Sequence, residues 1–306
     1  MILMKKPVSP QKYYSTQSSV TNPGRYAPLL NQLPNLVADL CKVIHGLIIH
    51  KNNTEDLYGF KLSRDRILES NTRYIEEILA RIIELDDSPL AKTRSPKKRF
   101  VGTCRDFALL LCSFLRQKSV PARLRSGFAT YFLPGYFWDH WVCEYWDGIK
   151  KQWILVDPEV GKEEIETYRI TINPLDLTRD QFMPSGKAWN ICRAGKMDAN
   201  LFGINETLVQ GFWFMRGSVF RDLAALNKIE LLPWDYTKFM DKHFKDLSVL
   251  AKSELELIDK IATLTSREDD SSFAEILALY QSDPRLQVGK TVKSYTDFGP
   301  KEVVLI

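Results

Sequence analysis

Residues 102–115 read GTCRDFALLLCSFL, and this stretch decides the fold. Thr103 is a residue typical of helix N-caps, and Asp106 stands three positions later, where its carboxylate can reach back to the cap amide in a variant of the capping box. The stretch therefore predicts a helix in which Cys104 occupies the first position. Apolar residues then recur at the spacing of one buried helix face: Phe107, Leu110, Leu111, Phe114 and Leu115.

The position of Cys104 is chemically notable. A sulfur at the amino end of a helix lies near the positive end of the helix dipole, which stabilises the nucleophilic thiolate. The alternative is a small, inert residue buried beneath a helix end, which is the commoner role of cysteine. Cys104 alone does not decide between these interpretations.

A second candidate, His140, precedes a run of aromatic and β-branched residues. Residues 141–146 read WVCEYW, a turn signal Asp-Gly follows, and residues 152–157 read QWILVD. This composition predicts two antiparallel strands joined as a hairpin. The other three histidines, His45, His50 and His243, have no recognisable partner and are interpreted as helix-face residues.

The hairpin brings a carboxylate to the imidazole. If residues 147–150 form the loop, Trp146 pairs with Lys151 and His140 pairs with Asp157, on one face of the sheet. A two-residue turn would make the second pair diagonal, still on the same face, because side chains alternate with a period of two. The sequence therefore predicts contact between His140 and Asp157.

Together, Cys104, His140 and Asp157 have the chemistry of a nucleophilic catalytic triad. A thiolate attacks a carbonyl, an imidazole takes and returns the proton, and a carboxylate orients the imidazole. The amide of Cys104, at a helix start, is a natural oxyanion donor. The competing interpretation is a structural histidine–aspartate pair at a sheet edge.

These residues also carry a family likeness. Residues 102–108 resemble the nucleophile motif of the transglutaminase-like superfamily, and residues 120–123, 139–145 and 153–159 resemble its next turn, its histidine strand and its aspartate strand. The resemblance implies an α+β, papain-like core in which a cysteine-bearing helix packs on an antiparallel sheet, here with helices before and after it. The histidine and aspartate motifs are also similar to the peptide N-glycanase core, although the Cys-x-x-Cys element of that enzyme is absent. Trp141 directly follows His140, where many members have a small residue.

Composition sets broad limits. The chain has 306 residues and a formal charge of +4, which is too small a bias to indicate nucleic-acid binding. It has no apolar run of about 20 residues that could cross a bilayer, and no secretory signal. Five cysteines without paired spacing favour free thiols and a cytoplasmic location. Neither a metal-binding motif nor a phosphate-binding loop is present, so we expect no metal and no cofactor.

The chain divides into three predicted parts. Residues 1–27 form an irregular arm, residues 28–172 the catalytic core with its amino-terminal helices, and residues 173–306 a loop-rich and helical region packed on the core. Periodicity predicts helices over residues 33–49, 63–85, 219–232, 234–264 and 273–280. Residues 173–217 are expected to be loop-like, and an extended tail follows residue 284.

The leading hypothesis is cysteine-dependent acyl transfer to water or an amine, on a protein, peptide or other amide-bearing substrate. Hydrolysis is preferred because water needs no second binding site. Trp138 and Trp141 flank His140 and are predicted to contact substrate, although core packing of one is an equal alternative. A catalytically inactive interaction module is one rival. A binder of acidic surfaces or nucleic acid, acting through the basic residues 92–99, is another. The sequence does not indicate an oligomeric state.

Overall fold

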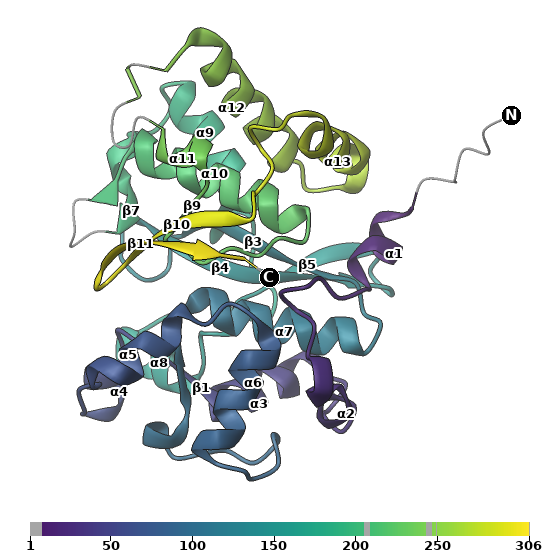
Figure 1. The fold of residues 1–306 in the computed structure, drawn as a ribbon, viewed down its shortest axis with the longest axis vertical. Helices are drawn as coiled ribbons and strands as arrows, with labels where there is room; N and C mark the ends of the chain where they lie inside the picture. The colour runs from purple at the N-terminus through teal and green to yellow at the C-terminus, as the bar shows by residue number, and fades with distance from the viewer. Residues whose placement is uncertain (1–7, 205–208, 243–246, 249, 306) are drawn as a thin grey trace, which may run out of the picture.

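The computed structural model describes residues 8–204, 209–242, 247–248 and 250–305. A central six-stranded sheet lies between two groups of helices (Figure 1). Its strand order is β6-β3-β4-β7-β8, with β5 paired to β4, and its long neighbours β3, β4 and β5 are antiparallel. This arrangement confirms the predicted α+β fold. The strands are β3 (Ala122–Ala129), β4 (Phe137–Asp147), β5 (Gln152–Val156), β6 (Phe182–Pro184), β7 (Phe202–Ile204) and β8 (Val209–Gln210).

Helix α7 (Cys104–Gln117) begins at Cys104, as predicted. The backbone amide of Thr103 donates to Asp106 Oδ2 at 2.9 Å, which confirms the predicted capping contact. The helix differs from the prediction in one respect, because every residue from Cys104 to Arg116 is buried, not one face alone. The sheet covers one side, and the amino-terminal helices cover the rest.

The amino-terminal group of elements encloses α7. Strand β1 (Ile48–His50) runs parallel to β2 (Phe100–Gly102), and the register places His50 beside Gly102. Gly102 is sterically required, because a Cβ there would lie 2.6 Å from Ile48 Cδ1 and 2.9 Å from Asp106 Oδ2. The helices of this group are α1 (Pro10–Tyr14), α2 (Ala27–Leu30), α3 (Val37–Leu47), α4 (Thr54–Tyr58), α5 (Arg64–Leu68) and α6 (Ile75–Leu85).

One predicted helix is broken in two. The sequence predicted a continuous helix over residues 63–85, but α5 ends at Leu68 and α6 begins at Ile75. The guanidinium of Arg73, between them, lies 2.6 Å from Asp235 in the carboxy-terminal region. This long-range ion pair competes with local helical periodicity.

The carboxy-terminal group covers the other side of the sheet and has its own apolar core (Figure 1). Residues 173–217 were predicted to be loop-like, but they contain three short strands and α9, together with the start of α10. The extended tail expected after residue 284 forms a hairpin. The elements of this group are α9 (Ser185–Arg193), α10 (Phe212–Leu226), β9 (Asp235–Tyr236), α11 (Lys238–Asp241), α12 (Lys252–Thr265), α13 (Phe273–Ser282), β10 (Thr291–Thr296) and β11 (Gly299–Val304). Helix α8 (Lys162–Tyr168) lies with the amino-terminal group, where it contacts α4 (Figure 1).

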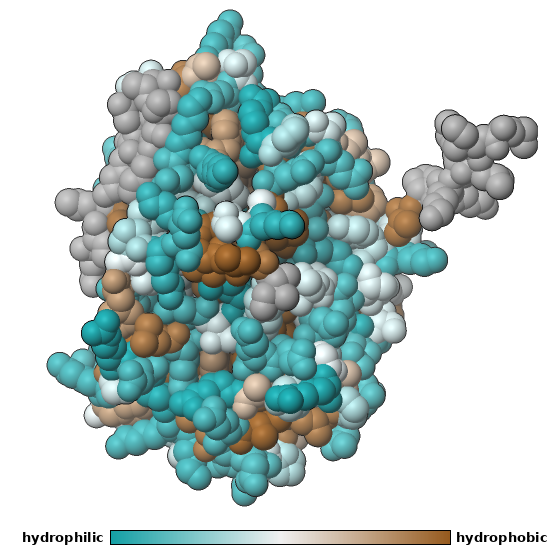
Figure 2. Space-filling model, viewed as in Figure 1, coloured by the Kyte–Doolittle hydropathy of each residue, from teal (hydrophilic) through white to brown (hydrophobic). Residues whose placement is uncertain are grey.

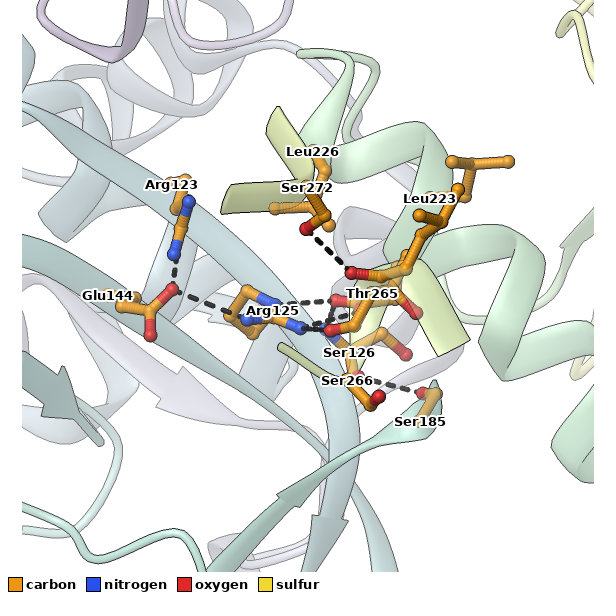
Figure 3. A network of polar contacts seen from close by, with 12 residues as sticks. Arg123, Arg125, Ser126, Glu144, Ser185, Leu223, Leu226, Thr265, Ser266 and Ser272 are labelled. Atoms are coloured by element: carbon orange, nitrogen blue, oxygen red, sulfur yellow. Dashed lines mark hydrogen bonds and ion pairs between the residues drawn. The ribbon is translucent and has the colours of Figure 1, made fainter. Parts of the chain in front are cut away.

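Buried charges tie α10 to the sheet. Arg123 and Arg125 of β3 both point at Glu144 of β4 (Figure 3). Arg125 also makes two 2.9 Å contacts with the carboxylate of Asp222 in α10. Glu144 is buried, but the neighbouring arginines hold the pKa of its carboxyl well below the usual range. The carboxy-terminal group is therefore joined to the sheet by ion pairs as well as by apolar contact.

The described part of the predicted arm packs on the body of the protein. Tyr14, in α1, is 1% exposed, and its hydroxyl donates to the carbonyl of Leu226 at 2.8 Å. The division into parts at residues 27 and 172 stays a prediction.

The surface is mostly hydrophilic on the face drawn in Figure 2, and apolar residues gather there in small groups. Ile149, at the tip of the β4–β5 hairpin, is 95% exposed. None of the helices in the described residues combines the length and apolar character that crossing a membrane requires.

Candidate active site

The β4–β5 hairpin sets the position of His140 relative to Asp157. Its loop comprises residues 148–151, one residue later than predicted, because Asp147 Oδ1 accepts hydrogen bonds from the amides of Ile149 and Lys150, at 2.8 and 3.0 Å. Trp146 therefore pairs with Trp153, not with Lys151. This correction shifts the register by two residues, which keeps every side chain on its predicted face.

His140 and Asp157 consequently meet as a diagonal pair. The Nε2 atom of His140 lies 2.8 Å from Asp157 Oδ2, so the predicted contact is present although the predicted direct pairing is wrong. Both residues are buried, with exposed fractions of 2% and 1%. Nδ1 is left as the His140 nitrogen available to the sulfur of Cys104.

Cys104 completes the cluster from the start of α7. Its sulfur, a ring nitrogen of His140 and a carboxylate oxygen of Glu159 all lie within 4.8 Å of one another. The structure thus brings together the three residues predicted from the sequence and adds Glu159. The amide of Cys104 belongs to the first turn of α7, where backbone donors lack partners within the helix.

The protonation of the sulfur differs from the expectation. Burial raises the pKa of the Cys104 thiol to about 11, and the neighbouring imidazole of His140 offsets only part of that rise. The prediction for Cys104 included the effect of the helix dipole on the thiol pKa, but not the effect of burying the side chain. Burial of Cys104 therefore opposes the thiolate that the helix dipole and the imidazole favour.

The pKa values of His140 and Asp157 are shifted in opposite directions. Burial lowers the pKa of His140, but the charge and hydrogen bond of Asp157 and the contact with Cys104 outweigh it, so the pKa is well above its ordinary value. Burial raises the pKa of Asp157, and the interactions with His140 and Tyr131 lower it further than burial raises it. The carboxylate therefore favours the imidazolium that forms when His140 receives a proton.

Tyr131 is a site residue that sequence reasoning missed. Its hydroxyl donates to Asp157 Oδ2 at 2.6 Å, on the same oxygen that contacts His140. The following residue, Phe132, packs edge-on against the imidazole at 5.0 Å between ring centres. Both residues follow β3, and no local pattern in the sequence relates them to a strand 26 residues later.

Two histidines that were predicted to lack partners also lie at the site. His45 Nε2 is 2.8 Å from the carbonyl oxygen of Pro158, directly after Asp157. His50 accepts a hydrogen bond at Nδ1 from the amide of Asn52 at 3.2 Å, and burial lowers its pKa to about 3, so it is neutral. His45 lies in α3, as the helix prediction expected, whereas His50 ends β1, whose parallel pairing with β2 is not revealed by short-range periodicity.

Trp138 and Trp141, which were both predicted to contact substrate, differ in their burial. Trp141 is fully buried within the core cluster that includes Cys104, so its side chain has no exposed surface for substrate. Trp138 is partly exposed and packs against Tyr136. Contact with substrate stays a prediction for Trp138. The side chain of Trp141 packs in the core, which was the alternative interpretation.

Comparisons with known proteins agree with this geometry. Residues 67–158 match the family model of the transglutaminase-like superfamily. A solved structure of a proposed cysteine protease from Cytophaga hutchinsonii is similar at 18% identity and a TM-score of 0.32, over 52% of this chain and 45% of the other. The chain thus spans less than half the length of that protein, and so weak a likeness carries no argument here. No curated protein sequence matched. The segment that matches the transglutaminase-like superfamily model contains Cys104, His140 and Asp157, the three residues that the sequence predicted to form the site.

Proposed function

We propose that the protein is a cysteine-dependent acyl-transfer enzyme that attacks an amide or ester carbonyl and forms a thioester on Cys104. The observation that carries the proposal is the 2.8 Å contact between His140 and Asp157, with the sulfur of Cys104 less than 4.8 Å from His140. The three side chains come from α7, β4 and the segment after β5, and this ordering matches the family whose model covers them.

The proposed reaction begins from the form of the Cys104–His140 pair that has lost one proton, in which the sulfur bonds to the carbonyl carbon while the imidazole carries the remaining proton. The amide of Cys104 donates to the oxygen that becomes negatively charged. The imidazolium, stabilised by Asp157, then protonates the leaving amine or alcohol, and the thioester remains. Water or a second amine, deprotonated by His140, attacks the thioester and restores the thiol.

Hydrolysis is the preferred second step. Water needs no binding surface of its own, whereas amine transfer needs a second site beside the thioester. A protein, peptide or glycopeptide is the proposed substrate class, since these carry the amide that the chemistry requires.

An unbiased screen of peptides and glycopeptides tests this proposal. Product masses distinguish cleavage, deamidation, cross-linking and glycan release. We expect a product with the wild type and none with Cys104→Ala. Cys112→Ala is the matched control, because Cys112 is fully buried in the same helix and lies away from the cluster. Equal products from wild type and Cys104→Ala would refute the proposal.

The basic-surface rival gains little from the structure. Arg94 is 2% exposed, and its guanidinium donates to backbone carbonyls, including that of Ser88 at 2.7 Å. Arg99 is also buried and donates to the carbonyl of Arg94. Two of the basic residues of segment 92–99 therefore hold their own loop together and present no cationic surface.

The inactive-module rival is distinguished by thiol reactivity. A scaffold leaves each thiol with the reactivity that its exposure sets, and Cys104 is 8% exposed whereas Cys112 and Cys143 are fully buried, so the pH profile of labelling has to be compared as well as the rate. Preferential alkylation of Cys104 over Cys112 and Cys143 would support the enzyme, and equal slow labelling would support the scaffold.

The proposal includes a cytoplasmic location, supported by five cysteines that are all unpaired.

A further inference from the structure

Glu159 is the buried acid that the proposed reaction does not use. It is 4% exposed, and one of its oxygens lies within 4.8 Å of both the Cys104 sulfur and a His140 nitrogen. It follows Asp157 by two residues, and its backbone amide donates to Asp157 Oδ1 at 2.9 Å. The short turn that positions the orienting aspartate therefore also delivers a second carboxylate to the sulfur.

The carboxylate of Glu159 lacks the donors that a buried acid usually has. Among the described residues, Oε2 has no hydrogen-bond partner, and Oε1 has a long 3.4 Å contact with Asn53 Nδ2. An unsatisfied buried carboxyl is costly, and such groups are usually paired or coordinate a metal. Burial raises the pKa of Glu159 to about 8, consistent with this lack of partners. The site thus holds an oxygen ligand without a partner.

His140 is oriented as a metal ligand would be. Its Nε2 contacts Asp157, and the carboxylate in turn accepts from Tyr131. Metal-binding histidines commonly direct one ring nitrogen at the metal and the other at a carboxylate that fixes the ring. Nδ1 is therefore free to coordinate on the side of Cys104 and Glu159.

We propose that Cys104, His140 and Glu159 form a zinc-binding site, and that bound Zn²⁺ reversibly blocks the nucleophile. The sulfur, nitrogen and oxygen ligands, with a water in the fourth position, are a donor set that zinc accepts. Zinc–ligand bonds of about 2.0–2.3 Å put neighbouring ligand atoms about 3.5 Å apart, so closure by roughly 1 Å is sufficient. Coordination releases to solvent the thiol proton of Cys104, together with any proton on the coordinating His140 nitrogen and on the Glu159 carboxyl, and it occupies the sulfur electron pair that would attack a carbonyl.

This inference deepens the proposed function, because the zinc-bound sulfur is the proposed nucleophile. The sequence analysis expected no metal because the three ligands, at positions 104, 140 and 159, match no short motif. They meet only through the packing of α7 against the hairpin.

The test is protection of Cys104 from alkylation. Metal-free protein is treated with iodoacetamide at increasing ZnCl₂, and modification of each cysteine is followed by peptide mass spectrometry. We expect zinc to slow alkylation of Cys104, and chelator to restore it. Co²⁺ should give the near-ultraviolet absorption of a thiolate–cobalt bond, lost in Cys104→Ala.

Glu159→Gln should weaken zinc protection by more than the 10–100-fold that loss of an outer-shell partner typically costs. Glu164→Gln is the matched control, because Glu164 is also buried but accepts from the amide of Gly161 and lies outside the cluster. Glu159→Asp, which keeps the charge on a shorter chain, provides a second variant if Glu159→Gln does not fold. We expect it to weaken protection as well.

The outcomes separate the two proposals. If Cys104 in metal-free protein is no more reactive than Cys112, the proposed function fails. If Cys104 is selectively reactive but zinc does not protect it, the zinc site is overturned and the function stands. Equal protection in wild type and both Glu159 variants would also overturn the three-ligand site.

Discussion

Asp157→Asn removes the charge that orients His140, and the structure shows why an amide cannot replace it. Asp157 Oδ2 accepts from Tyr131 and contacts His140, while Oδ1 accepts from the amide of Glu159. An asparagine has one acceptor and one donor end. With its oxygen at the Oδ2 position, the asparagine keeps neutral contacts with Tyr131 and His140 but turns its NH₂ group toward the amide of Glu159. With the amide reversed, the NH₂ group faces the Tyr131 hydroxyl and His140. In both orientations the negative charge beside His140 is lost.

The magnitude follows from the His140–Asp157 contact. A hydrogen bond to a charged group contributes about 1.5–3 kcal/mol. Because about 1.4 kcal/mol corresponds to a factor of ten, losing that stabilisation of the imidazolium should slow the reaction of Cys104 by about 10- to 150-fold. The same loss should lower the pKa of His140, since the carboxylate is what raises it.

The assay is alkylation of Cys104 by iodoacetamide between pH 5 and about 10, with thermal unfolding to confirm that the variant folds. Asp139→Asn is the control. Asp139 precedes His140 on β4 and points to the other side of the strand, where its partners are Arg221 and Ser218. It interacts with His140 through charge alone, so this control separates the loss of a nearby charge from the loss of the orienting hydrogen bond. A folded Asp157→Asn protein with wild-type rate and pH profile would refute the triad reasoning.

Three further outcomes are expected. In the wild type, the pKa values of Cys104 and His140 are both raised, so the pair retains its protons through neutral pH. The rate of Cys104 alkylation should therefore be low below the ordinary histidine pKa of about 6.5 and increase into the alkaline range. A rate that is already constant at pH 6 would contradict this expectation. Gly102→Ala places a Cβ 2.6 Å from an isoleucine methyl of β1, and should lower the free energy of unfolding by about 1–3 kcal/mol in urea denaturation, whereas an unchanged midpoint would show that the strand relaxes. Asp222→Asn leaves Arg125 with a weakened buried partner and should cost about 3–5 kcal/mol by the same measurement, and a loss below 1 kcal/mol would show that the pair is dispensable.

The sequence was sufficient for the local parts of this site. The capping contact of Thr103 with Asp106 and the facing of His140 and Asp157 each depend on a few neighbouring residues. Both follow from the periods of helix and strand. The hairpin loop was predicted one residue too early, but the resulting shift of two residues in strand register leaves each side chain on its predicted face of the sheet.

What the sequence did not reveal depends on contacts between distant segments. Tyr131, His45 and His50 reach the site only through tertiary packing, and no periodic pattern marks them. The burial of α7 on all sides was missed because its polar residues, such as Arg105 and Arg116, read as solvent-facing. In the structure these two guanidiniums form ion pairs with Asp106 and Glu230, which offset much of the cost of their enclosure. The raised pKa of the thiol is a consequence of the same enclosure.

The enclosure of α7 also determines where motion can occur in this protein. Its amide protons can exchange with solvent only when the surrounding core opens, so they should be among the slowest in hydrogen exchange. Cys104, the proposed nucleophile, is therefore fixed to a buried helix. Access to it has to come from the other wall of the site, where the chain turns between β3 and β4 and carries Tyr131 and Phe132 over the imidazole.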